Sequence, residues 1–190
     1  NSPGGWSPDD ETSLVAWYQN QVGITLNGSD VSAWADSAPA GLYDMVQDTA
    51  TEQPAYSAGV LTFASADTNN LQTSGANIEL TGDFTIGVKL HLTAGGGTLL
   101  GDNDINGEFI RFTSTTELRI RVANATAVNI DKDSGTFVED AYMVLTRASD
   151  VLTLYWKGVA QADTETKAGT ASIDAIGVRN SDANPYEGTI

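Results

Sequence analysis

The sequence contains no cysteine and only one histidine, His91. Without cysteine there is no disulfide framework and no thiolate metal site. A single histidine also rules out the usual multi-histidine zinc sites. Oxygen ligands are what remains for a metal, and they favour hard cations such as calcium.

Basic residues are also scarce, with 9 Lys and Arg against 25 Asp and Glu and a formal net charge of −16. A chain this acidic repels phosphate backbones and anionic lipid surfaces, which argues against nucleic-acid and membrane partners. No hydrophobic run approaches the length of a membrane span. The acids are dispersed along the sequence, which is typical of a solvated surface.

The length of 190 residues suits one β domain, and a chain of this size buries roughly 70% of its unfolded surface. Residues 1–12 are rich in turn formers and are interpreted as a connector, so the domain is predicted to span residues 13–190. The last residues, Gly188 to Ile190, resemble the start of a strand. We expect the polypeptide to continue beyond Ile190, or another chain to cover the open edge left there.

Two stretches alternate apolar and polar residues, which is the period of a half-buried β-strand. Residues 84–92 (FTIGVKLHL) alternate throughout, and in residues 118–122 (LRIRV) Arg119 and Arg121 take the solvent positions. Residues 141–158 contain two β-rich runs around a short polar turn, which predicts an antiparallel hairpin. Such strands need a second sheet over their apolar side, and no stretch has a helical period. The sequence therefore predicts an all-β, two-sheet antiparallel jelly-roll sandwich.

Several segments follow one another in a recognisable order: LVAWY (14–18), VSAWADS (31–37), QPAY and VLTF (53–63), the hairpin at 142–158, and YEGTI (186–190). This ordered set resembles the concanavalin A-like, laminin-G-type jelly rolls of bacterial secreted and phage virion surface proteins. The resemblance implies the lectin and glucanase type of sandwich. It implies little about function, because lectins, adhesion modules, viral surface proteins and glycosidases all use this fold.

Glycoside hydrolysis requires two carboxylates roughly 5–10 Å apart. On a strand, acids at alternate positions share a face, and the laminarinase-like enzymes of this fold carry an E-x-D-x-E run. This sequence has none. The pairs Asp163 and Glu165, and Asp131 and Asp133, lie in polar, turn-rich stretches that are typical of solvated loops.

The alginate-lyase members of the fold use sets of Arg, His and Tyr on adjoining strands. His91 and Arg111 are the residues of this chain that such a set would use, but no Q-x-H or Y-x-x-G-x-Y motif accompanies them. His91 is most simply a solvent-facing strand residue. We therefore predict no catalytic residues.

Calcium is the metal that the sequence favours. The loop 101–108 (GDNDINGE) gathers the oxygen ligands Asp102, Asp104, Asn106 and Glu108, although Asp, Asn and Gly are also ordinary turn residues. Residues 182–184 (DAN) form a weaker second candidate.

Glycan binding requires exposed aromatic platforms with polar edges. Trp17 and Trp34 sit in positions similar to those of the family and are expected to belong to the core. Trp156, which lies beside a lysine near a turn, together with Tyr186 and Tyr43, forms the predicted glycan site.

These observations predict a non-catalytic structural or binding module, not an enzyme, on the surface of a phage virion. Its partners would be other virion or multidomain-protein subunits, further copies of itself, and host glycans. Two alternatives remain open: a carbohydrate-binding or adhesion domain of a secreted bacterial protein, and a polysaccharide hydrolase or lyase with an unrecognised site. Each alternative places the chain outside the cell, on a virion or secreted.

Overall fold

The computed structural model describes residues 7–93, 95–103, 107–123, 125–179 and 181–190. Helix is confined there to three 3₁₀ turns, at Pro8–Asp10, Ala50–Glu52 and Ser65–Asp67. The predicted all-β class is therefore confirmed.

The strands are β1 (Ile24–Asn27), β2 (Asp30–Trp34), β3 (Met45–Val46), β4 (Ala55–Ser57), β5 (Val60–Phe63), β6 (Leu71–Thr73), β7 (Ile78–Leu80), β8 (Phe84–Leu92), β9 (Gly97–Asp102), β10 (Gly107–Phe112), β11 (Glu117–Ile120), β12 (Val128–Asp131), β13 (Asp140–Ala148), β14 (Val151–Trp156), β15 (Val159–Thr166), β16 (Ala171–Ile173), β17 (Ala175–Ile176) and β18 (Gly188–Thr189).

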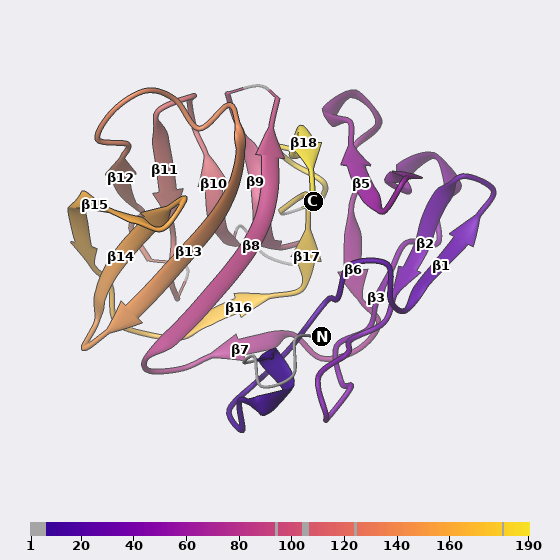
Figure 1. The fold of residues 1–190 in the computed structure, drawn as a ribbon, viewed down its shortest axis with the longest axis horizontal. Helices are drawn as coiled ribbons and strands as arrows, with labels where there is room; N and C mark the ends of the chain where they lie inside the picture. Colours follow the sequence, from indigo (N-terminus) through magenta and orange to yellow (C-terminus); the bar gives the residue numbers. More distant parts are fainter. Residues whose placement is uncertain (1–6, 94, 104–106, 124, 180) are drawn as a thin grey trace.

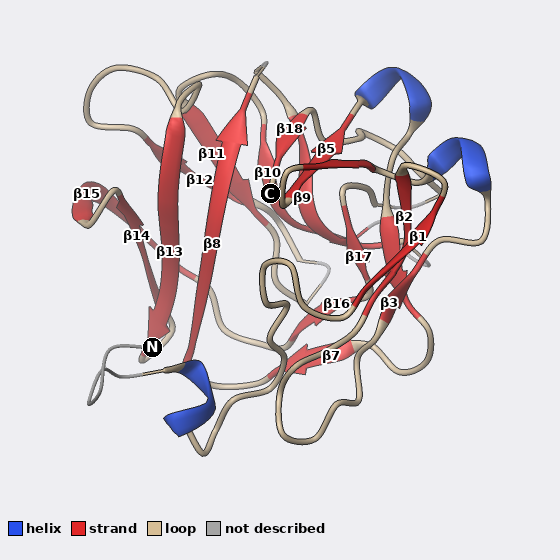
Figure 2. Ribbon diagram, turned by 45° about the vertical axis from the view of Figure 1, so that its right-hand side comes forward, coloured by secondary structure: helices blue, strands red, loops and turns tan. Residues whose placement is uncertain are grey.

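The strands form a jelly-roll sandwich of two facing layers (Figures 1 and 2). One layer runs in the order β5-β18-β8-β13-β14-β15, and we call it the hairpin sheet because β13 and β14 are the predicted hairpin. The other runs β12-β11-β10-β9-β17 and continues through β6 and β3 to β2; we call it the β9–β12 sheet. The short pair β7 and β16 is separate from both, and Figure 1 shows it crossing one end of the sandwich.

The core lies between the two layers and is filled by alternate residues of each strand. Phe112 of β10 and Trp156 of β14 come from opposite layers, and their ring centroids are 6.3 Å apart. Phe137, from the loop between β12 and β13, packs against both rings at 5.3 and 4.8 Å. Edge-to-face packing of this kind adds to the stabilisation that burial alone gives.

Side chains close the seam between the edge strands β12 and β15. The backbone N–H of Asp131 donates to the Asp163 carboxylate at 2.9 Å, and that of Asp133 donates to the Gln161 side chain at 3.0 Å. In return, the N–H of Ala162 donates to the Asp133 carboxylate at 3.0 Å. These acids satisfy edge backbone groups that would otherwise invite pairing with another chain. Their role here is structural, where the sequence suggested loop solvation.

Residues 14–18, the first segment of the family-like set, form no strand and join no ladder. Trp17 instead donates its N–H to the Asp36 carboxylate at 2.9 Å and accepts from the N–H of Ser37 at 2.7 Å. The C-terminal strand β18 pairs with β5 on one side and with only His91 and Leu92 of β8 on the other. That the polypeptide continues beyond Ile190, or that another chain covers this edge, stays a prediction.

A buried arginine ties the hairpin to two loops. Arg147 of β13 is 2% exposed, and it donates to the carbonyls of Gly82 and Gly169, each at 2.6 Å. Longer bonds of 3.4 Å reach the carbonyls of Lys167 and Leu80. The guanidinium also lies 4.6 Å from the centroid of the Phe84 ring. Five donors in a rigid planar fork suit this arrangement, which a lysine would not reproduce.

We predict that Arg147→Met lowers the free energy of unfolding by about 2–4 kcal/mol, because buried carbonyls lose their donors. Denaturant unfolding checks this, with Lys167→Met as the matched control, for which we expect a change within about 0.5 kcal/mol. Equal stability of the two variants would show that Arg147 does not tie the loops to the hairpin.

Candidate functional site

The outer face of the β9–β12 sheet carries a row of polar side chains across neighbouring strands. Thr98 of β9 is paired with Arg111 of β10, Arg111 with Arg119 of β11, and Arg119 with Asn129 of β12. Side chains directly opposite in an antiparallel pair point to the same side, with Cβ atoms roughly 4.5–5.5 Å apart. The two arginines therefore stand side by side on this face.

The period of β11 determines which way its arginines point. Leu118, Ile120 and Val122 are 0% exposed and belong to the core. Arg119 and Arg121 alternate with them and are half-buried, so both side chains lie on the outer face. The prediction that these two arginines face away from the core is confirmed.

A fourth arginine joins the row from a loop. A Cβ placed on Gly101 of β9 would lie 3.0 Å from the Cβ of Arg179 and 3.1 Å from the Cγ2 of Thr98. Arg179 therefore lies next to the Thr98 end of the row. The chain has five arginines; four of them, Arg111, Arg119, Arg121 and Arg179, make up what we call the arginine face.

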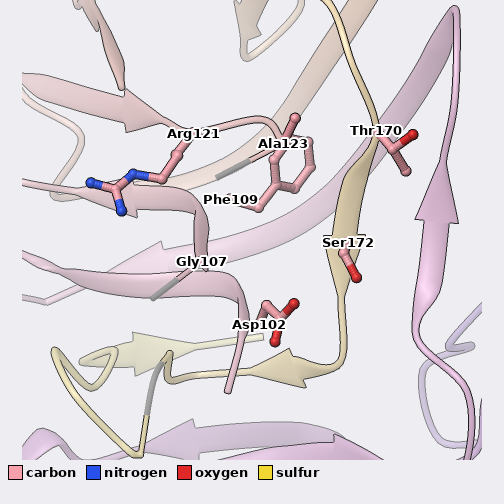
Figure 3. A pocket seen from close by; sticks show the side chains of 7 residues that line it. All are labelled: Asp102, Gly107, Phe109, Arg121, Ala123, Thr170 and Ser172. Atoms are coloured by element: carbon pink, nitrogen blue, oxygen red, sulfur yellow. The ribbon is translucent and has the colours of Figure 1, made fainter. Parts of the chain in front are cut away.

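A small pocket adjoins the arginine face at Arg121 (Figure 3). Its volume is about 200 Å³, and it is lined by Asp102, Gly107, Phe109, Arg121, Ala123, Thr170 and Ser172. Typical ligand pockets measure roughly 300–1,000 Å³, so this one suits a single small group. In Figure 3 the guanidinium of Arg121 points away from the hydroxyls of Thr170 and Ser172, so its stem lines the pocket.

His91 and Arg111, the residues that an alginate-lyase-like set would use, do not lie side by side. Arg111 lies on β10 of the β9–β12 sheet, whereas His91 lies on β8 of the hairpin sheet. His91 does face outward, as predicted, and its Nδ1 lies 3.0 Å from the Asp140 carboxylate.

The predicted glycan site is wrong for two of its three residues, because they are buried. Trp156 is 3% exposed, since it shares the inner face of β14 with Leu152 and Leu154. Tyr186 is 0% exposed, and its hydroxyl donates to the carbonyl of His91 at 3.1 Å. Burial raises the pKa of the Tyr186 phenol well above its usual value. Tyr43 is half-buried.

The predicted calcium loop falls largely outside the described residues, which omit Asp104, Asn106 and the Glu108 side chain. Asp102 is 3% exposed and lines the small pocket. In the second candidate, Asp182 accepts a bond from the Asn103 amide at 3.1 Å. Across the described part of the chain, no group of three or more His, Asp or Glu side chains is arranged to hold a metal ion. Calcium binding by residues 102–108 stays a prediction.

Sequence reasoning missed the arginine face as a unit. The alternation of Arg119 and Arg121 was visible, but their neighbours depend on register. Strands β9 and β10 are offset by two irregularities, at Glu108/Ile110 and Ile110/Arg111. No sequence pattern indicates those offsets, so the pairing of Arg111 with Thr98 could not be foreseen.

No helix in the described part of the chain is long and apolar enough to cross a membrane. No family model matches the sequence, and no curated protein matches it. Among solved structures, the chain is similar to alginate lyase AlgAT5 from polysaccharide lyase family 7, with a TM-score of 0.37 and 12% identity. The match covers 90% of this chain and 79% of the lyase.

This comparison corrects two expectations, that the chain is a non-catalytic virion module and that it is not an enzyme. The similar solved structure is a polysaccharide lyase, and so an enzyme. With 12% identity, the likeness leaves the chemistry of this chain to be inferred from its own residues.

The hydrogen bonds of the Glu139 carboxylate predict how the stability of the fold depends on pH. Glu139 accepts a bond from the Lys157 ammonium at 2.6 Å and one from the Trp156 indole at 2.7 Å. The lysine first, and then the indole, lower the pKa of the Glu139 carboxyl. A lowered folded-state pKa contributes stability above the unfolded-state pKa, and that contribution is lost as the pH falls through the folded-state pKa.

Glu139→Gln should therefore lower the Tm at neutral pH, and its effect should shrink as the pH falls through the folded-state pKa of the carboxyl and the wild-type group becomes protonated in both states. Thermal unfolding across this range checks the prediction, with Glu52→Gln as control. A loss of Tm that is the same at both ends of the pH range would contradict the assigned cause.

Proposed function

We propose that the chain is an enzyme that cleaves an anionic polysaccharide, a polyuronate, bound across the arginine face. The supporting observation is the cross-strand pair Arg111 and Arg119, flanked by Arg121 and Arg179, in a chain with a net charge of −16. Guanidinium groups bind carboxylates through paired, charge-assisted hydrogen bonds. A polyuronate presents one carboxylate per sugar, which is the group that a guanidinium recognises.

The reaction that such a face favours is β-elimination. A base removes the proton next to the uronate carboxyl, the bond to the glycosidic oxygen breaks, a carbon–carbon double bond forms, and a proton goes to the departing oxygen. No further reactant is needed. Negative charge develops on the carboxyl group during this step, and fixed cations stabilise it. Binding the carboxylate between arginines therefore supports both affinity and rate.

Hydrolysis finds less support in the same residues. The acid pairs considered for hydrolysis, Asp131 with Asp133 and Asp163 with Glu165, include carboxylates that already bond the backbone. Asp133 and Asp163 accept backbone hydrogen bonds along the β12–β15 seam. A retaining or inverting hydrolase needs two carboxylates placed on either side of the scissile bond.

The laminin-G-type likeness of the hairpin remains part of this proposal, because proteins of that kind act on or bind extracellular material. A polyuronate substrate is itself extracellular, which supports a secreted protein.

The test is cleavage of a panel of polyuronates, beginning with alginate, alongside neutral glucans. We expect product with the ultraviolet absorbance of an unsaturated uronate from at least one polyuronate and none from the glucans. Reducing ends without that absorbance would indicate hydrolysis, and absence of any cleavage would remove the proposed function.

With the polyuronate that the chain cleaves as substrate, Arg119→Ala and Arg121→Ala should each lower kcat/KM about 10–100-fold, because each variant loses one charge-assisted contact. Lys157→Ala, just after β14 in the hairpin sheet and 51% exposed at its side chain, serves as the control and should change little. Added salt should weaken substrate binding, since exposed charge interactions are screened. Arginine variants with unchanged kcat/KM would place the substrate elsewhere.

A further inference from the structure

The hairpin sheet has an outer face of its own, and its most exposed large hydrophobic side chain is aromatic. Tyr142 lies in β13 and is 64% exposed, whereas its strand neighbours Ala141 and Met143 are 5% and 0% exposed. The backbone of Tyr142 is paired with β8 on one side and bonded to the N–H of Lys157 on the other. The ring therefore projects from a fixed point of the sheet into solvent.

Polar and charged groups surround this ring in register. Lys89 of β8 is paired with Tyr142, and its ammonium lies 5.9 Å from the ring centroid. Two residues further along β8, His91 is paired with Asp140, and the His91 Nδ1 lies 3.0 Å from an Asp140 carboxylate oxygen. The His91 and Asp140 side chains are 34% and 89% exposed, so both remain accessible to a ligand.

Apart from Lys89, His91 and Asp140, the outward residues of β8, β13 and β14 are uncharged. A row of hydroxyls crosses β8, β13, β14 and β15, with each residue paired to the next: Thr85, Thr146, Thr153 and Thr164. Between this row and Tyr142 lies a second row: Gly87, Val144, Tyr155 and Ala160. Among the outward residues of β8, β13 and β14, all of which the structure describes, Asp140 carries the only carboxylate.

We propose that this face is a second polysaccharide-binding surface, on which a pyranose ring stacks against Tyr142. The apolar face of a sugar packs on an aromatic ring, while its hydroxyls hydrogen-bond to groups at the ring's edge. Lys89, His91 and Asp140 supply such groups beside Tyr142, and the threonine row supplies hydroxyls for the continuing chain. The carboxylate-poor face also lowers the repulsion that an acidic polymer would meet elsewhere on this protein.

The surface belongs to the hairpin sheet, so it lies on the opposite side of the sandwich from the arginine face. It would hold the polymer without taking part in its cleavage. The proposal depends on the proposed function only for the class of ligand. Stacking on an aromatic ring accepts neutral and acidic sugars, and both are included in the test.

The experiment uses retardation of the whole chain in native gels containing a polyuronate or a neutral glucan. To separate the two surfaces, all variants carry Arg119→Ala and Arg121→Ala, which weakens the arginine face. In this background we expect Tyr142→Ala to lower the affinity for at least one polymer about 10-fold, as expected for one stacking contact. Tyr142→Phe should keep the affinity, because it keeps the ring.

Leu42→Ala is the matched control, because Leu42 is similarly exposed, at 66%, on another part of the chain. Equal retardation of the Tyr142→Ala and Leu42→Ala variants would overturn the proposal. So would a Tyr142→Ala variant that binds polymer normally but converts a dimer into a monomer in sedimentation, since the face would then be a self-association surface.

Cleavage of short oligouronates by Tyr142→Ala in the otherwise wild-type chain should be unchanged. Loss of cleavage in that variant would place Tyr142 in the reaction site and overturn a separate surface. If Tyr142-dependent retardation persists while the wild-type chain cleaves nothing, this surface stands and the proposed reaction falls.

Discussion

The alternation of side chains along a β-strand governs most of this molecule. Each strand offers every second residue to the space between the two sheets and the rest to the outside. In β11 this sends Leu118 and Ile120 into the core and leaves Arg119 outside. In β13 it buries Met143 and exposes Tyr142. A shift of either strand by one residue would lose its core contacts and its outer face together.

The two outer faces that result differ in chemistry. The β9–β12 sheet gathers four of the five arginines on one side, while the hairpin sheet presents an aromatic ring, hydroxyls and few charges. The fifth arginine, Arg147, is buried and bonded to backbone carbonyls. Four of the few cationic side chains therefore lie on one face, where an anionic ligand would bind. The net negative charge of the rest of the chain opposes such a ligand.

Local pattern predicted much of the fold but less of the site. Residues 84–92 form β8 with the predicted bounds, and the hairpin appears at β13 and β14. The outward direction of Arg119 and Arg121 also followed from the sequence, because alternation is a property of one strand. The pairing of Arg111 with Arg119 did not, because register depends on how separate strands meet. Trp156 was predicted to be exposed because it precedes Lys157. Its alternation with Leu152 and Leu154 indicated the core instead, and the structure follows that alternation.

The central claim is that the arginine face binds a polyuronate, and the side-chain Nε–H signals of the five arginines in NMR spectra test it most directly. Titration with an oligouronate should shift the signals of Arg119 and Arg121, together with those of Arg111 and Arg179. The signal of Arg147, which is 2% exposed in the hairpin sheet, should not move. Binding that leaves the Arg119 and Arg121 signals unchanged would contradict the account.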